Sequence, residues 1–227
     1  MSAENNFETD KIKTAQGDLV ITCIGHATLM MSFGGKIIHI DPVTQMADYT
    51  KLPKADLILV THEHPDHFDL KAIDLIKTGK TSIMTTEIVA RQLPGSIVLK
   101  SGDEKTIMGL KIEAVPAYNL VNMRSPGVPY HAKGIGNGYI LALSDKRLYI
   151  AGDTENIPEM KALRNIDTAF LPMNLPYTMT PEMVADAVRA FRPKIIYPYH
   201  YGKTDTSKLI DLLQNEKNIE VRIRKMM

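Results

Sequence analysis

The stretch Thr61–His67, which reads Thr-His-Glu-His-Pro-Asp-His, carries the strongest chemical signal in this chain. It follows the apolar run Leu57–Val60, so it lies at the end of a predicted buried strand, where open α/β sheets place their functional groups. Imidazole and carboxylate groups are ligands for zinc, manganese and iron. Burying so many titratable groups with neither a metal nor hydrogen-bond partners would cost several kcal/mol. The stretch therefore predicts a metal site with His62, His64, Asp66 and His67 as candidate ligands.

Short apolar runs alternate with turn signals along the rest of the chain. These runs predict strands at Leu19–Ile24, Thr28–Phe33, Lys36–Ile40, Asp56–Val60, Ser82–Thr85, Leu110–Val115, Tyr139–Leu143, Arg147–Ala151, Thr168–Leu171, Ile195–Pro198 and Glu220–Ile223. Helical spacing of apolar residues predicts helices at Phe68–Lys77, Thr86–Leu93, Pro158–Leu163, Pro181–Phe191 and Ser207–Glu216. Gly34-Gly35 predicts a tight hairpin. The order of elements indicates an α/β fold, and two similar halves with helices outside their sheets would give a four-layer αβ/βα sandwich.

The bulk composition excludes several classes of protein. The chain has 227 residues, 44% of them hydrophobic, which favours a single domain over residues 17–227 after a polar N-terminus, residues 1–16, that we expect to be flexible. No apolar stretch approaches the roughly 18 residues of a membrane helix, and the polar start has no apolar core of a signal peptide. We expect a cytoplasmic protein by default, with the mature form of an exported protein as the alternative. The net charge of +1 argues against a broad nucleic-acid surface, and the single cysteine, Cys23, is expected in the core.

The run Thr61–His67 resembles the HxHxDH signature of the metallo-β-lactamase superfamily. Further landmarks of that family follow in the right order along the chain: Ile40-Asp41-Pro42, Gly152-Asp153-Thr154 and Tyr199-His200-Tyr201-Gly202. The resemblance spans Gly25 to Gly202 and implies the four-layer αβ/βα sandwich. Gly25-His26-Ala27 also resembles the branch that contains ascorbate-6-phosphate lactonase and related small metal-dependent hydrolases.

The resemblance implies a site with two divalent metal ions, roughly 3.5–4 Å apart as in two-metal hydrolases generally. His62, His64 and one further group would hold the first ion, and Asp66, His67 and His200 the second. Asp153 would bridge them. Zinc is the default by base rate, with manganese and iron as alternatives. Asp66 would take a proton from the attacking water, Asp41 would accept the N–H of a ligand histidine, and His26 would contact the substrate at the rim.

The histidine that relatives use as the third ligand of the first ion is missing from its usual position in this sequence. Relatives carry a histidine in a Pro-Ala-aromatic-His run, whereas this chain reads Pro116-Ala117-Tyr118-Asn119. Asparagine is a poor ligand for zinc. His131 follows in the same long loop, so we expect this loop to fold back, with His131 completing the first metal site and Asn119 lying behind it.

These features favour a metal-dependent hydrolase that cleaves an ester, lactone or phosphodiester bond of a small substrate. Three alternatives stay open: a nucleic-acid phosphodiesterase of the same fold, an iron-dependent oxidoreductase, and a non-catalytic metal-binding protein. We expect specificity to depend on the loops Tyr118–Lys133 and Met173–Met179. The sequence gives no indication of the oligomeric state.

Overall fold

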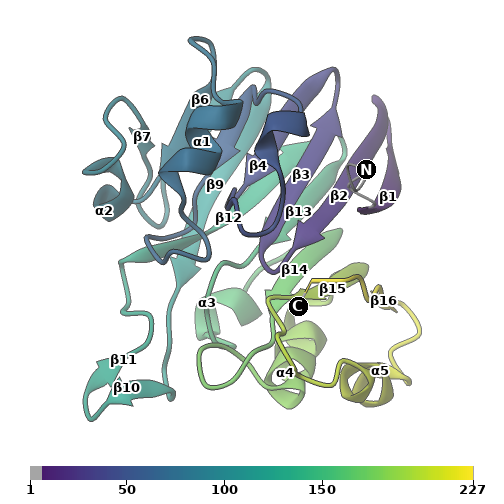
Figure 1. Cartoon of the computed structure of the whole chain (residues 1–227). Helices are drawn as coiled ribbons and strands as arrows, with labels where there is room; N and C mark the ends of the chain where they lie inside the picture. The colour runs from purple at the N-terminus through teal and green to yellow at the C-terminus, as the bar shows by residue number, and fades with distance from the viewer. Residues whose placement is uncertain (1–6, 227) are drawn as a thin grey trace, which may run out of the picture.

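Two seven-stranded β-sheets, one from each half of the chain, face each other in the computed structural model, which describes residues 7–226 (Figure 1). The first sheet has the strand order β1-β2-β3-β4-β5-β6-β7, with β1 (Glu8–Thr14), β2 (Gly17–Gly25), β3 (Thr28–Phe33), β4 (Lys36–Ile40), β5 (Leu57–Leu59), β6 (Ser82–Thr85) and β7 (Ile97–Val98). The second has the order β8-β9-β12-β13-β14-β15-β16, with β8 (Glu104–Ile107), β9 (Leu110–Ala117), β12 (Gly136–Leu143), β13 (Lys146–Ile150), β14 (Thr168–Pro172), β15 (Ile195–Tyr199) and β16 (Glu220–Val221).

Both halves follow the same plan. Strands β1 to β4 pair in antiparallel fashion and β4 to β7 in parallel, and the second sheet repeats this with β8, β9, β12 and β13 antiparallel and β13 to β16 parallel. As a result Asp41 directly follows β4 in one half, and Asp153 closely follows β13 in the other. The prediction of two similar halves is confirmed.

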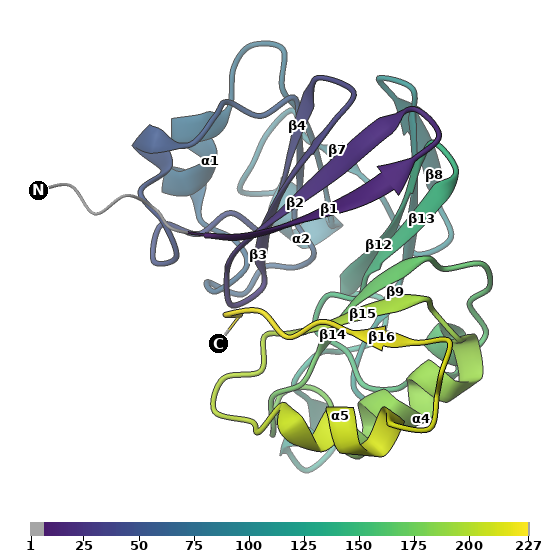
Figure 2. The same ribbon diagram turned by 90° about the vertical axis from the view of Figure 1, so that its right-hand side faces the viewer.

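Helices cover the outer faces of both sheets (Figure 2). The first sheet carries η1 (Tyr49–Lys51), α1 (Leu70–Ile76) and α2 (Glu87–Ala90), and the second carries α3 (Pro158–Lys161), α4 (Pro181–Phe191) and α5 (Ser207–Leu213). The main core lies between and behind the sheets, and a smaller apolar cluster lies under α1. A separate hairpin, β10 (Met123–Ser125) and β11 (Val128–Pro129), projects from the β9–β12 connection (Figure 1). The four-layer sandwich is therefore confirmed.

Local sequence explains most element boundaries. Helix α4 begins after Thr180, whose hydroxyl accepts a hydrogen bond from Met183 N at 3.1 Å, and it ends at Arg192 in a left-handed conformation. The Gly34-Gly35 hairpin joins β3 to β4 with Phe33 paired to Lys36, as predicted. Each predicted strand and helix is present: β3, β4, β6 and α4 have the predicted bounds, and the others have shifted ends. Strands β1, β7, β8, β10 and β11 and the helix η1 were not predicted. Cys23 is buried, as expected, and burial raises the pKa of its thiol to about 12.

The N-terminal segment corrects one expectation. Residues 8–14, within the segment that was expected to be flexible, form β1 at the edge of the first sheet, and residues 1–6 of that segment lie outside the described residues. Ile12 is the strand's one buried side chain, and Asp10 forms a two-pronged ion pair with Arg224 at 2.7 and 2.8 Å. Within the described part of the chain, no helix is long and apolar enough to cross a bilayer.

Asp10→Asn is expected to lower the free energy of unfolding by about 1–3 kcal/mol, because it leaves a partly buried Arg224 without its charge partner. Burial alone would raise the pKa of Asp10, but Arg224 outweighs burial and lowers this pKa below 3.8. The contribution is therefore full above pH about 4 and is lost as the pH falls through the lower native pKa. Urea unfolding of wild type and variant between pH 3 and pH 7 measures this. The exposed Asp18→Asn is the control, and equal losses in the two variants would contradict the prediction.

Candidate metal centre

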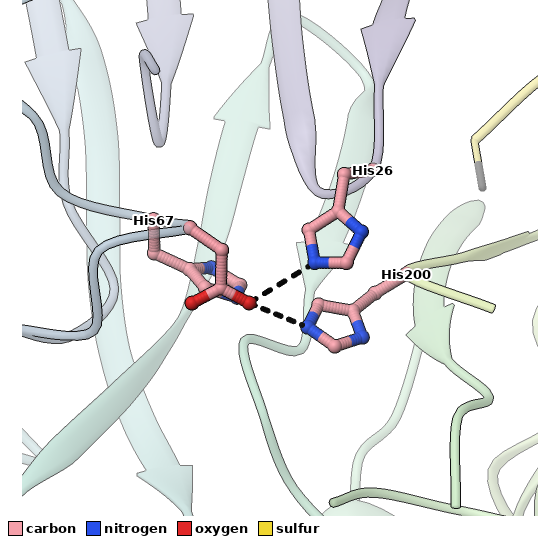
Figure 3. Close-up of side chains that lie close together, drawn as sticks. His26, His67 and His200 are labelled. Carbon is pink, nitrogen blue, oxygen red and sulfur yellow. Dashed lines mark hydrogen bonds and ion pairs between the residues drawn. The ribbon is translucent and has the colours of Figure 1, made fainter. Parts of the chain in front are cut away.

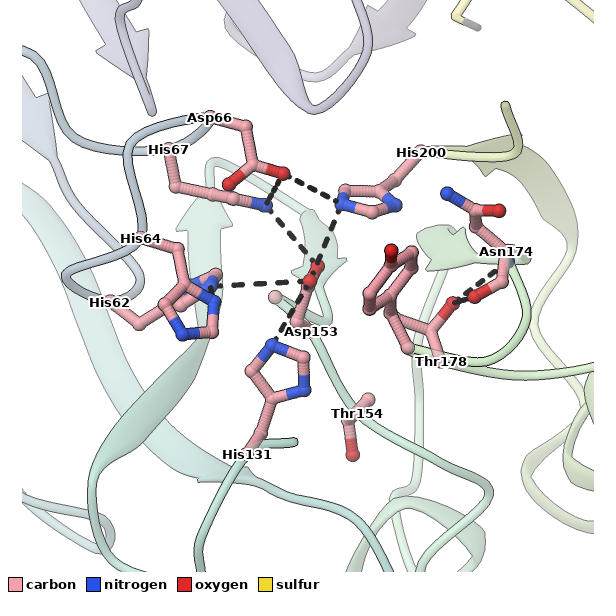
Figure 4. Close-up of polar contacts among 12 residues, drawn as sticks. His62, His64, Asp66, His67, His131, Asp153, Thr154, Asn174, Thr178 and His200 are labelled. Carbon is pink, nitrogen blue, oxygen red and sulfur yellow. Dashed lines mark hydrogen bonds and ion pairs between the residues drawn. The ribbon is translucent and has the colours of Figure 1, made fainter. Parts of the chain in front are cut away.

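The candidate site lies at one edge of the sandwich, where loops from the two sheets meet (Figure 4). His62, His64, Asp66 and His67 follow β5, while the later residues come from the second half of the chain. Their ligand atoms form three overlapping groups, in each of which the atoms lie within 4.8 Å of one another. The first contains His62, His64 and His131, the second contains His26, Asp66, His67 and His200, and a third, formed by His62, His67 and Asp153, joins the other two. All the histidines and aspartates that the sequence analysis singled out as ligands are thus brought together.

The first group surrounds a point between two loops. His62 Nε2 and His64 Nδ1 are 3.1 Å apart, and the rings of His62 and His131 meet edge to face with centroids 5.2 Å apart. The β9–β12 connection folds back, as expected, so that the buried His131 reaches the two histidines from the opposite sheet. His131 is therefore in a position to be the third ligand of this group.

The second group includes one residue that we had placed only at the rim. Asp66 Oδ2 lies 3.1 Å from His26 Nε2 and 3.3 Å from His200 Nε2 (Figure 3). The rings of His26 and His200 are 3.9 Å apart between centroids. His26 is thus part of the group around Asp66.

Asp153 lies between the first and second groups. Its Oδ2 is 3.2 Å from His131 Nε2 and 3.3 Å from His200 Nε2, and its Oδ1 is 3.3 Å from His67 Nε2 (Figure 4). The side chain is almost completely buried. A carboxylate in this place contacts imidazoles of both groups at once, which is the arrangement that a bridging ligand requires.

Asp41 and Thr61 accept hydrogen bonds from two histidines and so place a proton on Nδ1 of each. Asp41 Oδ2 lies 2.7 Å from His67 Nδ1 and can only accept, so His67 donates from Nδ1. The Thr61 hydroxyl donates to the same carboxylate at 2.6 Å and therefore accepts from His62 Nδ1 at 3.0 Å. Both histidines consequently turn Nε2 toward the centre, where this atom is available to a metal ion that displaces any proton on it. Asp41 thus contacts one of the predicted ligand histidines, and its role behind a metal ligand stays a prediction.

Asn119 fixes the protonation of His131 in the same way. Its side-chain orientation is set by main-chain groups, because Oδ1 accepts from His131 N at 2.7 Å and Nδ2 donates to Tyr177 O at 2.9 Å. The same Oδ1 lies 2.8 Å from His131 Nδ1, which must therefore donate. His131 Nε2 is left with a lone pair that faces Asp153 and the first group. Asn119 lies behind His131, as expected.

A buried carboxylate supports this asparagine. Glu155 is fully buried and accepts hydrogen bonds from the main-chain N–H groups of Leu120, Val121 and Asn122 at 2.7–2.8 Å. Its Oε1 also accepts from Asn119 Nδ2 at 3.2 Å. One side chain thus holds the start of the loop that delivers His131.

Glu155→Gln is expected to weaken metal binding about 10–100-fold, as is typical when the group behind a ligand is changed. An amide presents N–H groups to N–H donors, so the metal-free protein should also lose about 1–3 kcal/mol of stability. Metal titration and urea unfolding of the metal-free protein measure the two effects. Glu159→Gln is the control, since Glu159 contacts the same loop at the surface through Lys133. A Glu155→Gln protein that binds metal like wild type would show that Glu155 does not position His131.

Three of the site residues have a left-handed backbone. The φ angles are 52° for His26, 46° for Asp41 and 48° for His200, in a region that costs non-glycine residues roughly 1–2 kcal/mol. Main-chain hydrogen bonds hold these turns, since His200 N donates to His26 O and Asp41 N donates to Leu59 O, each at 2.9 Å. The strained turns aim the three side chains into the site.

The electrostatics of the site suit a cation. Burial alone would raise the pKa of Asp153, but His200 and His67 hold it well below its ordinary value, so the carboxylate is ionised. Burial, helped by the charge of His67, lowers the pKa of His62. Among residues 7–226, no hydrogen bond reaches the buried Nε2 atoms of His67, His131 and His200 or Oδ1 of Asp153. These buried imidazole nitrogens have no hydrogen-bond partner, and they converge beside ionised carboxylates. Such a set of atoms fits divalent metal ions.

Two adjoining cavities open over the centre. One has a volume of about 230 Å³ and borders His62, and the other has a volume of about 510 Å³ and borders His26 and His200. Both are lined by His64, Arg124, Tyr130, His131 and Asp153. Tyr130 and Tyr177 come from the two loops that were expected to carry specificity.

Sequence reasoning missed three contributors to the site: Thr61, Glu155 and Arg124. Thr61 stands inside a recognised motif, next to His62, and Glu155 directly follows another, two residues after Asp153. A polar residue at each of these positions was a signal that could have been used. Arg124 gave none, because its neighbours in the sequence are ordinary loop residues.

Comparison with known proteins agrees with this geometry. Residues 20–200 match the beta-lactamase superfamily domain. The chain is 32% identical over 188 residues to a UPF0173 metal-dependent hydrolase from Thermus thermophilus, covering 79% of this chain and 82% of the relative. It is 50% identical to a crystal structure from Parabacteroides distasonis assigned as a metal-dependent hydrolase, with a TM-score of 0.93 and 97% and 100% of the two chains covered.

A metallo hydrolase from Ignicoccus hospitalis shares the fold at 23% identity, with a TM-score of 0.74 and 91% and 95% of the two chains covered. None of these three proteins is described as a lactonase, so the finer resemblance to the ascorbate-6-phosphate lactonase branch stays a prediction. The chain belongs to the metallo-β-lactamase superfamily and, within it, to the metal-dependent hydrolases of the UPF0173 family.

Proposed function

We propose that this protein uses two divalent metal ions, zinc by default, to hydrolyse an ester, lactone or phosphodiester bond of a small substrate. His62, His64 and His131 would hold one ion, and Asp66, His67 and His200 the other. Manganese or iron would suit the same ligand types. The observation that carries the proposal is the position of Asp153, whose carboxylate lies 3.2–3.3 Å from imidazoles of both groups.

The chemistry that such a pair of ions supplies is the activation of water at neutral pH and the polarisation of the bond under attack. Asp66 is the residue best placed to accept the proton of the attacking water, because its side chain is 41% exposed and lines the larger cavity. Burial alone would raise the pKa of Asp66, but the close contacts of its carboxylate with His200 and His26 keep it well below its ordinary value. His26 thus keeps the carboxylate ionised and oriented.

The experiment is a substrate panel with metal-loaded protein: 4-nitrophenyl acetate, γ-butyrolactone and bis(4-nitrophenyl) phosphate. At least one should be cleaved, and Asp66→Asn should lose this activity while the exposed Asp205→Asn retains it. Metal analysis of the active protein identifies the ions and their number.

Other outcomes would favour the alternatives. Oxygen consumption by iron-loaded protein without hydrolysis would indicate an oxidoreductase, and salt-sensitive binding of RNA or single-stranded DNA would indicate a nuclease. Protein that holds two ions and cleaves nothing in the panel would contradict the proposal.

A further inference from the structure

One basic side chain stands over the candidate metal centre. Arg124 lies on β10 and lines both cavities together with His64, His131 and Asp153. It is the one lysine or arginine among the described residues that line these two cavities. A ligand that reaches the centre through either cavity therefore passes this positive charge.

The contacts of Arg124 leave the N–H groups of its guanidinium able to bind a ligand. Its guanidinium carbon lies 5.8 Å from the centre of the Tyr130 ring, and Tyr130 meets Tyr177 edge to face at 5.1 Å. Over residues 7–226, no carboxylate forms an ion pair with Arg124, whereas Lys133 of the same loop pairs with Glu159 at 2.8 Å. A guanidinium held over an aromatic ring can still offer its N–H groups to a ligand.

We infer that Arg124 binds an anionic group of the substrate, a carboxylate or a phosphate, while the bond to be cleaved lies at the metal centre; the inference rests on the proposed function. A guanidinium offers two parallel N–H groups that match two oxygens of such an anion. The other charged side chains that line the cavities, Glu63, Asp66 and Asp153, are acidic, and Asp66 and Asp153 would be engaged by the metal ions. Arg124 is therefore the side chain there that can pair with an anionic group lying away from the ions. Arg124 therefore determines a preference for anionic over neutral substrates.

A matched pair of esters tests this inference: neutral 4-nitrophenyl acetate and the anionic mono-4-nitrophenyl ester of glutaric acid. Wild type should prefer the anionic ester. Arg124→Gln should lower kcat/KM for it by about 10–100-fold, mostly through KM, and leave the neutral ester within about twofold. Arg124→Lys should retain part of the preference. Lys133→Gln is the control, since it removes the same charge from the same loop outside both cavities.

Binding measurements separate this inference from the proposed function. Metal-loaded wild type and Arg124→Gln are each titrated calorimetrically with glutarate and with inorganic phosphate. Wild type should bind at least one of the two anions, and Arg124→Gln should bind that anion about tenfold more weakly. If Arg124→Gln binds the anion more weakly than wild type but wild type cleaves none of the esters, the anion site is supported and the hydrolase proposal is contradicted. The inference is overturned if Arg124→Gln binds both anions like wild type, if neither anion binds wild type, or if the variant keeps the preference for the anionic ester.

Discussion

Asp153→Ala is expected to abolish hydrolysis and to leave a protein that no longer holds two ions together. The Asp153 carboxylate contacts imidazoles of both ligand groups, so its removal affects both ions. Asp41→Ala should be milder, about 10–100-fold in metal affinity, because Asp41 acts on the site through Thr61 and His67. Elemental analysis of the metals retained per chain after gel filtration distinguishes the two variants.

The comparison needs folded proteins. Both variants remove a buried carboxylate, so the metal-free forms should first be compared by thermal unfolding, and Asp153→Asn offers a variant of nearly the same shape. Two ions at full occupancy in Asp153→Ala would show that Asp153 does not bridge. A loss of metal in Asp41→Ala equal to that in Asp153→Ala would place the two residues in equivalent roles.

Removing the metal is expected to abolish activity and to lower the unfolding temperature. A ligand present at 1,000 times its dissociation constant stabilises the folded state by about 4 kcal/mol. In a protein of this size each kcal/mol shifts the midpoint by about 2–4 °C, so the expected decrease is about 8–16 °C. Calorimetric scans before and after treatment with a chelator measure it, and adding the metal back should restore both properties.

Asp153→Ala serves as the internal control for this experiment, since a protein that holds less metal should respond less to the chelator. Equal unfolding temperatures of wild type with and without tightly bound metal would mean that the ion does not stabilise the fold. The buried imidazole nitrogens without hydrogen bonds argue for a large effect, because removing the ion leaves them without any partner.

The parts of the site that could be predicted from the sequence are those set by local rules. His62, His64, Asp66 and His67 directly follow a short, fully buried strand, and the end of such a strand positions them together. The resemblance to the superfamily then supplied Asp153 and His200, which no local rule connects to that strand. His131 was found by elimination within a long loop, and the structure brings it to the expected place.

The remaining parts depend on contacts between distant segments. Strand β1 has alternating polar residues and one buried side chain, so its pattern is weak, and its pairing depends on β2 and on Arg224 near the other end of the chain. Glu155 supports the site because it accepts hydrogen bonds from three main-chain N–H groups of another loop. Nearly every residue has such an N–H group, so the sequence does not indicate which ones will meet a given carboxylate. The same holds for Arg124, which gains its importance from where the hairpin projects.

The duplicated plan of the two halves has a consequence for how this protein is made. His62, His64, His26, Asp66 and His67 come from the first half, but each of the first two groups is completed by a residue of the second half, His131 or His200. A nascent chain that has emerged only as far as β7 therefore carries most of the donors but neither finished set. On the proposed ligand assignment, the first group is complete once His131 is in place, whereas the second is complete only after β15 has been synthesised and has paired with β14, which brings His200 into place. On this assignment, binding of the full set of ions would be a late event in biosynthesis, and a chain truncated before His200 is expected to remain without its full complement of metal.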